Sequence, residues 1–295
     1  MTSRVTTAPV GAPVVTSCVV VVVVVVVTGG VSSAQPINAN GANANNQMRI
    51  LIIFPSVIRS FLVRRVGSIQ IQQMLYVVAT PIGNLGDITL RALKILKDVD
   101  LVAAEDTRHS GILLKHYQID KPLVSYHEHN EAMRTAQLVE RLATGEQIAL
   151  ITDAGTPGLS DPGARLIREC IKRELPFTVI PGASSISTAL VGSGFSAEKF
   201  FVGGFLPNKS GRRERELRAA ATREETSVYF ESPYRLTKTL KACIEIMQDR
   251  QICVARELTK KFEEFRRGTA DELLAHYEAR PPKGEIVLII SCRGE

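Results

Sequence analysis

Short apolar runs alternate with amphipathic stretches from residue 74 onward. Four of these runs are expected to be buried strands: Leu75–Ala79, Leu101–Ala104, Ile148–Ile151 and Phe177–Ile180. Between them, apolar residues recur at helical spacing, which predicts helices at Leu90–Val99, Glu131–Thr144 and Ala164–Arg173. Because continuously apolar strands are buried on both faces, this alternation predicts a mostly parallel sheet covered by helices.

A second set of strands follows the glycine-containing stretch Gly192–Lys199, which comes after an expected helix at Ser184–Val191. Its strands are expected at Phe200–Gly203, Ser227–Glu231, Ile252–Arg256 and Ile286–Ser291, and its helices at Thr237–Met247 and Asp271–Tyr277. We place a domain boundary near Gly194. The prediction is therefore an N-terminal α/β domain, residues 74–193, and a C-terminal α/β domain, residues 194–295.

Residues 1–73 have no such pattern. They contain nine consecutive valines, residues 19–27, and an Asn/Ala/Gly stretch at Asn38–Asn46, so we expect a disordered extension or a misassigned start before Met74. A signal or transit peptide is the alternative, since Arg4 precedes the apolar run, but polyvaline matches such signals poorly. The run Pro13–Val27 is shorter than the roughly 18–20 residues that span a bilayer, so a membrane protein is disfavoured.

The basic character of the chain is confined to this extension. The net charge is +6, from 36 basic and 30 acidic residues, and five of the basic residues are arginines within residues 1–73, which have no acidic residue. Residues 74–295 are therefore nearly neutral, and overall charge does not indicate RNA binding. The five cysteines include no C-x-x-C pair, which favours a reduced cytoplasm and is against a Cys-ligated zinc site.

Three polar loops each follow an apolar strand directly: Thr80–Asp87, Thr152–Gly163 and Pro181–Ser185. Ligands of open parallel sheets bind at the carboxyl ends of the strands, where such loops meet. Glycine lets a backbone approach a ligand closely, and the N-terminus of a following helix offers free N–H groups. Each loop alone could be a simple turn, but three at one edge predict a binding site. The chain has neither the dinucleotide-binding nor the P-loop glycine motif, which is against NAD and ATP enzymes.

These loops, together with Ala104-Glu105-Asp106-Thr107-Arg108 and Phe230-Glu231-Ser232-Pro233-Tyr234-Arg235, resemble the tetrapyrrole-methylase superfamily, the class III methyltransferases. Within it they are most similar to the branch that methylates small-subunit ribosomal RNA. The resemblance covers residues 74–295 and none of residues 1–73. It implies two α/β domains with a cofactor cleft between them, S-adenosylmethionine as cofactor, a homodimer and a cytoplasmic location.

The resemblance also implies which residues meet the cofactor. Carried over one by one, they are Pro81, Asp153, Gly155, Ser160, Asp161, Ala183, Ser184 and Phe230, with Ala255, Gly284 and Glu285 on the C-terminal domain. Methyl transfer is an in-line displacement that depends on alignment and electrostatic positioning, so no metal is expected.

The implied acceptor is the ribose 2′-hydroxyl of a cytidine in the decoding region of 16S ribosomal RNA. Because a hydroxyl is a weak nucleophile, a proton acceptor would help, and Glu105, Asp106 and the segment His127–Asn130 are candidates. Asp106 and Arg108 could instead orient RNA, or form an ion-paired helix start. His127 and His129 could begin a metal site, but no third ligand is evident and ordinary polar residues are favoured.

A cationic cluster follows the expected strand at Phe200–Gly203. Lys209, Arg212, Arg213 and Arg215 could clamp RNA phosphates, although interleaved Glu214 and Glu216 are also typical of a solvated helix. Arg235, beside Tyr234, could clamp the substrate next to the cofactor.

Two other functions are compatible with the sequence. One is a porphyrinoid methylase or diphthine synthase of the same fold. The other is a non-catalytic RNA-binding module for ribosome assembly, which the intact glycine and aspartate positions of the three loops disfavour.

Overall fold

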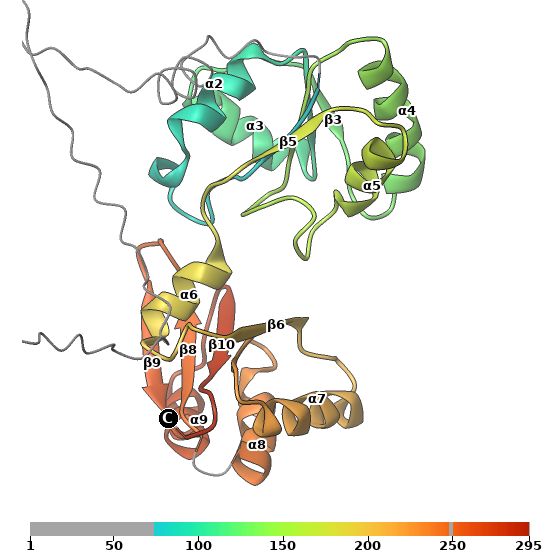
Figure 1. Ribbon diagram of the computed structural model, residues 1–295. Helices are drawn as coiled ribbons and strands as arrows, with labels where there is room; N and C mark the ends of the chain where they lie inside the picture. Colours follow the sequence, from blue (N-terminus) through green and yellow to red (C-terminus); the bar gives the residue numbers. More distant parts are fainter. Residues whose placement is uncertain (1–73, 248–249, 295) are drawn as a thin grey trace, which may run out of the picture. The chain divides into compact units, whose positions relative to one another are not determined.

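The protein is described by a computed structural model that covers residues 74–247 and 250–294 (Figure 1). The expectations for residues 1–73 fall outside the described residues. All elements below belong to one compact unit of the chain. In this described part, no helix is both long enough and apolar enough to cross a membrane.

The first sheet is wholly parallel, as the apolar runs predict. Its strands are β1 (Leu75–Val78), β2 (Leu101–Ala104), β3 (Leu123–Ser125), β4 (Ile148–Ile151) and β5 (Phe177–Ile180), in the order β3-β2-β4-β1-β5. Every side chain of β1, β2 and β4 is buried, because helices cover both faces of the sheet. The four predicted strands are confirmed, and β3 is an additional short strand at the edge.

Two pairs of helices cover this sheet. Helices α2 (Leu90–Asp98) and α3 (Thr107–His116) pack on one face, and α4 (Glu131–Ala143) and α5 (Ala164–Lys172) on the other (Figure 1). A short 3-10 turn, η1 (Leu85–Asp87), lies in the first loop. The side chain of Asp106 caps α3 by accepting a hydrogen bond from the Arg108 backbone N–H, at 2.8 Å. The ion-paired helix start, one of the alternatives considered for this segment, is confirmed.

The second sheet is mixed. Its strands are β6 (Phe200–Phe205), β7 (Thr226–Glu231), β8 (Ile252–Arg256), β9 (Glu264–Gly268) and β10 (Ile286–Ile290), in the order β6-β7-β10-β8-β9. Strands β6 and β7 are parallel, and the other pairs are antiparallel.

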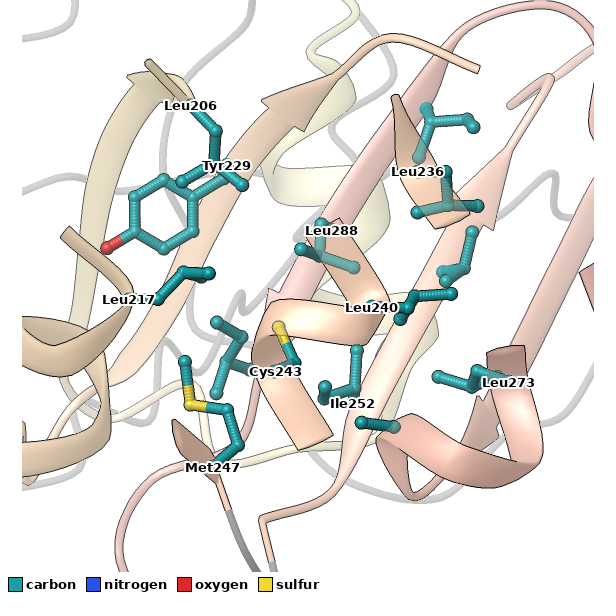
Figure 2. Close-up of a cluster of buried hydrophobic side chains, with 14 of the residues drawn as sticks. Leu206, Leu217, Tyr229, Leu236, Leu240, Cys243, Met247, Ile252, Leu273 and Leu288 are labelled. Atoms are coloured by element: carbon teal, nitrogen blue, oxygen red, sulfur yellow. The ribbon is translucent and has the colours of Figure 1, made fainter. Parts of the chain in front are cut away.

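Helices α7 (Ser210–Thr222), α8 (Leu236–Met247) and α9 (Ala270–Ala279) bury one face of the second sheet. Figure 2 shows the side chains of Leu240, Cys243, Ile252 and Leu288 within this apolar layer. Within the described residues, none of the four cysteines takes part in a disulfide: Cys170, Cys243, Cys253 and Cys292.

Helix α6 (Ser185–Ser193) covers the other face of the second sheet. It contacts β8, β9 and β10, and Ile186, Ala189 and Leu190 share an apolar cluster with side chains of that sheet (Figure 1). This helix precedes the predicted boundary near Gly194, which stays a prediction. Gly194 ends α6 with φ +75°, a left-handed conformation that glycine adopts at little cost.

Candidate active site

A cavity of about 320 Å³ lies where loops of the first sheet meet residues of the second. This volume is within the range of roughly 300–1,000 Å³ that is typical of small-molecule sites. All three predicted loops contribute to its wall: Ile82 from the first, Gly155, Ser160 and Asp161 from the second, and Ser184 from the third. The sequence-predicted loops therefore share one cavity, which we call the first cavity.

Backbone pairing holds two of these loops together. Thr80 and Gly155 form an isolated antiparallel bridge, in which Thr80 N–H donates to the Gly155 carbonyl at 2.8 Å and Gly155 N–H donates to the Thr80 carbonyl at 3.2 Å. The Thr80 hydroxyl also donates to the Thr152 carbonyl at 2.9 Å. Gly155 has φ +83°, so a side chain there would strain the bridge.

Seven of the eleven residues predicted to bind the cofactor line the first cavity: Gly155, Ser160, Asp161, Ser184, Phe230, Gly284 and Glu285. The other four lie next to its wall. Pro81, Asp153 and Ala183 are chain neighbours of wall residues, and Ala255 pairs across the sheet with Val287, which lines the cavity. Contact of all eleven with a cofactor stays a prediction.

Carboxylates gather beside the polar side of the cavity. The carboxylate of Glu105 accepts a hydrogen bond from the Thr152 hydroxyl at 2.5 Å and faces the Asp153 N–H at 3.4 Å. The Asp153 carboxylate in turn accepts from the Asp106 N–H at 3.2 Å. These contacts hold the ends of β2 and β4 together. They place Glu105 and Asp153 next to Asp161, which lines the cavity.

The environment shifts the pKa values of these acids in different directions. Burial, together with the charges of Glu105 and Asp153, raises the pKa of Asp161 to about 6. Burial also raises the pKa of Asp153. Hydrogen bonds from Arg108 lower the pKa of Asp106, which is partly exposed. The cavity therefore has a desolvated acidic side, which favours a cationic group of a ligand.

Another part of the cavity wall is apolar. It contains Ile82, Ile186, Phe230, Leu258 and Val287, which also belong to one apolar cluster. Phe205, at the end of β6, is 66% exposed and lies 5.2 Å from Phe230 between ring centroids. Sequence analysis did not identify Phe205 or Leu258 as site residues. Their positions are the sequence signal that could have identified them. Phe205 is the last residue of β6, and Leu258 follows β8 closely.

The other predicted catalytic groups lie apart from the wall. The side chain of Arg108 is 91% exposed and pairs with Asp106 at 3.1 Å. Asn130 donates from its side-chain amide to the ring of His127 at 3.1 Å, and His127 lies 5.9 Å from His129 between ring centroids. Within residues 74–247 and 250–294, no group of three or more His, Cys, Asp or Glu residues could hold a metal ion.

The predicted RNA-binding cations fall into two groups. Lys209, Arg212 and Arg215 are exposed at the start of α7. Arg213 is only 8% exposed and donates to the Asn208 carbonyl at 3.3 Å. Arg235 pairs with buried Glu231 at 2.6 Å and donates to the Leu206 carbonyl at 3.2 Å. Arg213 and Arg235 therefore bind the chain itself, and RNA contact by any of the five stays a prediction.

The sequence matches the family model of Tetrapyrrole (Corrin/Porphyrin) Methylases over residues 74–274. The chain belongs to this methylase family. It is 47% identical over 219 residues to ribosomal RNA small subunit methyltransferase I of Synechocystis sp., covering 74% of this chain and 78% of that protein. It is 44% identical over 217 residues to the protein of the same name from Thermotoga maritima, covering 74% and 97% of the two chains.

Solved structures show the same fold. This tetrapyrrole methylase superimposes on uroporphyrin-III-C-methyltransferase from Thermus thermophilus with a TM-score of 0.54 at 21% identity, covering 74% of this chain and 94% of that one. The prediction of the tetrapyrrole-methylase fold with two α/β sheets is confirmed. At this identity the likeness concerns the fold alone.

Proposed function

We propose that the chain transfers a methyl group from S-adenosylmethionine to the ribose 2′-hydroxyl of a cytidine in the decoding region of 16S ribosomal RNA. The observation that carries the proposal is the first cavity, in which three glycine-bearing loops, an acidic side and an apolar side meet. The names of the relatives at 47% and 44% identity support small-subunit ribosomal RNA as the acceptor. The cytidine and the 2′-hydroxyl rest on the resemblance of the motifs.

The residues of the first cavity fit S-adenosylmethionine. The apolar side, with Phe230, Leu258 and Ile186, offers a slot for the adenine ring. The desolvated carboxyl groups of Asp161 and Asp153 suit the positive charges of the ligand. S-adenosylmethionine, when bound, supplies an electrophilic methyl group. The chain positions the acceptor and keeps water away from the reacting atoms.

The proton acceptor is proposed among the acids at the end of β2. Glu105 is held by the Thr152 hydroxyl, and Asp106 caps α3 next to it. Arg108 is exposed beside Asp106, so we propose that it contacts the RNA backbone. Lys209, Arg212 and Arg215 are proposed to contact phosphates. We further propose that the enzyme works as a homodimer in the cytoplasm. Sedimentation of the full chain tests whether it forms the dimer.

The deciding experiment incubates the full chain with S-adenosylmethionine labelled in its methyl group and with unmodified small ribosomal subunits. Label on the ribose of one cytidine is expected. Subunits that already carry the modification are the matched control and should accept no label. Label on a base would contradict the 2′-hydroxyl assignment, and transfer only to a tetrapyrrole would favour the porphyrinoid alternative. Binding of subunits without affinity for S-adenosylmethionine would favour a non-catalytic module.

A further inference from the structure

A second cavity, of about 380 Å³, is formed between helix α9 and the ends of β8 and β9. We call it the arginine pocket. Its wall includes Arg256, Glu257, Glu264, Arg266, Tyr277, Arg280 and Lys283. None of these residues lines the first cavity.

Positive charge is in excess in the arginine pocket. Three arginines and one lysine face two carboxylates, Glu257 and Glu264. Each carboxylate already has partners: Glu257 binds Lys260 at 3.0 Å, and Glu264 binds Arg256 at 3.1 Å and Arg266 at 3.0 Å. The carboxylates therefore leave part of the cationic charge of the wall uncompensated.

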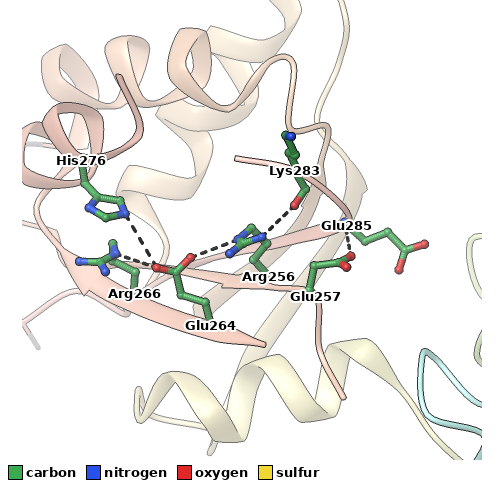
Figure 3. A network of polar contacts seen from close by, with 7 residues as sticks. All are labelled: Arg256, Glu257, Glu264, Arg266, His276, Lys283 and Glu285. Atoms are coloured by element: carbon green, nitrogen blue, oxygen red, sulfur yellow. Dashed lines mark hydrogen bonds and ion pairs between the residues drawn. The ribbon is translucent and has the colours of Figure 1, made fainter. Parts of the chain in front are cut away.

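Several hydrogen-bond donors of the wall remain unused. Both Arg256 and Arg266 bind Glu264 through Nε (Figure 3). Arg256 also donates from Nη1 to the Lys283 carbonyl at 3.2 Å. Within the described part of the chain, the terminal nitrogens of Arg266 and the side chains of Arg280 and Lys283 have no hydrogen-bond partner.

A buried hydroxyl completes the set of donors. Tyr277 is 2% exposed, and its hydroxyl has no hydrogen-bond partner in the part of the chain that the structure describes. Leaving a buried hydroxyl unpaired costs free energy, so native proteins rarely retain one without a ligand or water to satisfy it. A ligand that accepts several hydrogen bonds and carries negative charge would satisfy both the hydroxyl and the free cations.

A phosphate group has this chemistry. Its oxygens accept several hydrogen bonds at once, and guanidinium groups bind it in the bidentate geometry that arginine favours. The position of the pocket connects it to the methylation site, because Lys283 in its wall directly precedes Gly284 and Glu285, which line the first cavity. The hydrogen bond from Arg256 to the Lys283 carbonyl fixes this connection.

We propose that the arginine pocket binds a backbone phosphate of the RNA substrate, close to the nucleotide whose ribose reaches the first cavity. The inference rests on the proposed function because that function supplies RNA as the molecule that carries the phosphate. The pocket itself is a phosphate site on the evidence of its free donors and excess cations. It would hold the RNA strand in register with the methyl donor, as phosphate contacts do in other nucleic-acid complexes.

The first experiment measures binding of unmodified small subunits to the full chain over a series of salt concentrations. Replacing both free cations, Arg280→Gln with Lys283→Gln, should weaken binding about tenfold at ~0.1 M salt and reduce the salt slope by about 1–2. The matched control is Lys94→Gln with Lys97→Gln, which removes two exposed charges of α2 that line neither cavity. Affinity for S-adenosylmethionine should be unchanged in both variants.

The second experiment tests the pocket without RNA. Inorganic phosphate should raise the melting temperature of the wild-type chain, and Tyr277→Phe should reduce this effect. Because the variant loses an unpaired hydroxyl, its stability without phosphate should be equal or higher. A purely structural role for Tyr277 would leave the phosphate effect unchanged, and that result would overturn the assignment of the hydroxyl to a phosphate ligand.

The outcomes separate this inference from the proposed function. If the wild-type chain binds subunits and the Arg280/Lys283 variant binds them equally well with the same salt slope, the inference is wrong and the proposed function stands. If phosphate stabilises the chain but the wild type has no affinity for subunits, the proposed function fails and the RNA assignment of the pocket fails with it. Stabilisation by free phosphate with an unchanged RNA slope assigns the pocket to a free phosphate compound instead.

Discussion

The carboxyl group of Asp161 lines the first cavity and changes its charge near pH 6. Its pKa lies above the ordinary value of 3.8 because burial and the charges of Glu105 and Asp153 disfavour the ionised form. A folded-state pKa above the unfolded one means that this group contributes less stability as the pH rises from about 4 to about 6. The same rise in pH creates the negative charge that attracts a cationic ligand.

Affinity for S-adenosylmethionine should therefore increase between pH 5 and pH 7 in the wild-type chain. Asp161→Asn should remove most of this pH dependence and weaken binding at pH 7 by about tenfold, the equivalent of about 1.4 kcal/mol. The unfolding free energy at pH 7 should not fall, because the variant removes a desolvated charge. Calorimetric titration at several pH values checks the affinity. An unchanged pH profile in the variant would assign the dependence to another group.

Gly284 is a residue at which a side chain is unfavourable. It has φ +84°, and a Cβ atom there would overlap the carboxylate of Glu257. Gly284→Ala should lower the unfolding free energy by about 2–3 kcal/mol, from left-handed strain and the displaced carboxylate. Gly204→Ala is the matched control, because Gly204 also has positive φ, at +66°, but has open space around it. Urea unfolding measures the loss of unfolding free energy in both variants. Equal losses would show that backbone strain alone destabilises Gly284→Ala, without a contribution from the overlap with Glu257.

At the scale of elements, the turn between β7 and α8 depends on a buried ion pair. Glu231 is 3% exposed and accepts hydrogen bonds from the Thr239 hydroxyl at 2.5 Å and the Ser232 N–H at 2.7 Å, in addition to its pair with Arg235. Arg235 also holds the Leu206 carbonyl, so this one guanidinium joins β7, α8 and the segment after β6. The same turn supplies Ser232 and Pro233 to the first cavity.

Arg235→Ala should lower the unfolding free energy by about 3 kcal/mol, because it leaves the buried charge of Glu231 without its cation. Lys238→Ala, on the exposed side of the same helix, is the control and should cost less than about 0.5 kcal/mol. Chemical unfolding provides the comparison. If Arg235→Ala reduced RNA affinity without any loss of stability, the residue would serve the substrate and not the turn.

Sequence patterns predicted eight of the described strands but neither the short edge strand β3 nor the charged strand β9. Continuous apolar runs identify β1, β2, β4 and β10, because burial on both faces leaves no polar position. Strand β9 has the sequence Glu-Phe-Arg-Arg-Gly, and the ion pairs of Glu264 with Arg256 and Arg266 replace the apolar pattern that a strand normally shows. The strand order and the mixed directions of the second sheet depend on long-range pairing, which no local pattern encodes.

The candidate site could also be predicted only where it depends on local sequence patterns. Gly155 and Asp161 belong to loops directly after apolar strands, so their meeting at one edge follows from a parallel sheet. Phe205 is the last residue of β6 and Leu258 follows β8, so their place depends on how these two strands end. Arg213 is predicted as an exposed cation, because its neighbours in the sequence do not reveal that its side chain folds back onto Asn208.

At the scale of the whole molecule, α6 connects the two sheets. It follows β5 of the first sheet, its first residue Ser185 lines the first cavity, and its apolar side packs on the second sheet. Arg267 of β9 donates to the Ser193 carbonyl at 2.5 Å and to the Gly192 carbonyl, which anchors the C-terminus of the helix. A cation at this end also stabilises the helix dipole.

Gly192 permits this packing, because a Cβ atom there would overlap the ring of Phe265. Gly192→Ala should lower the unfolding free energy by about 1–3 kcal/mol and weaken affinity for S-adenosylmethionine, since a displaced α6 moves Ser184 and Ser185. Gly211→Ala, in a helix position with open space, should instead be neutral or stabilising by up to about 1 kcal/mol. Thermal melts and calorimetry test both. If the Gly192→Ala variant were less stable but bound S-adenosylmethionine with full affinity, the position of α6 would not determine binding in the first cavity.

The position of β9 at the end of the second sheet has a consequence for the behaviour of the protein at high concentration. A strand with one unpaired side is a template on which further chains can add, and charged side chains along it make such growth unfavourable. Glu264, Arg266 and Arg267 place charges along this strand. Replacing them with apolar residues should therefore favour fibrils or amorphous precipitate.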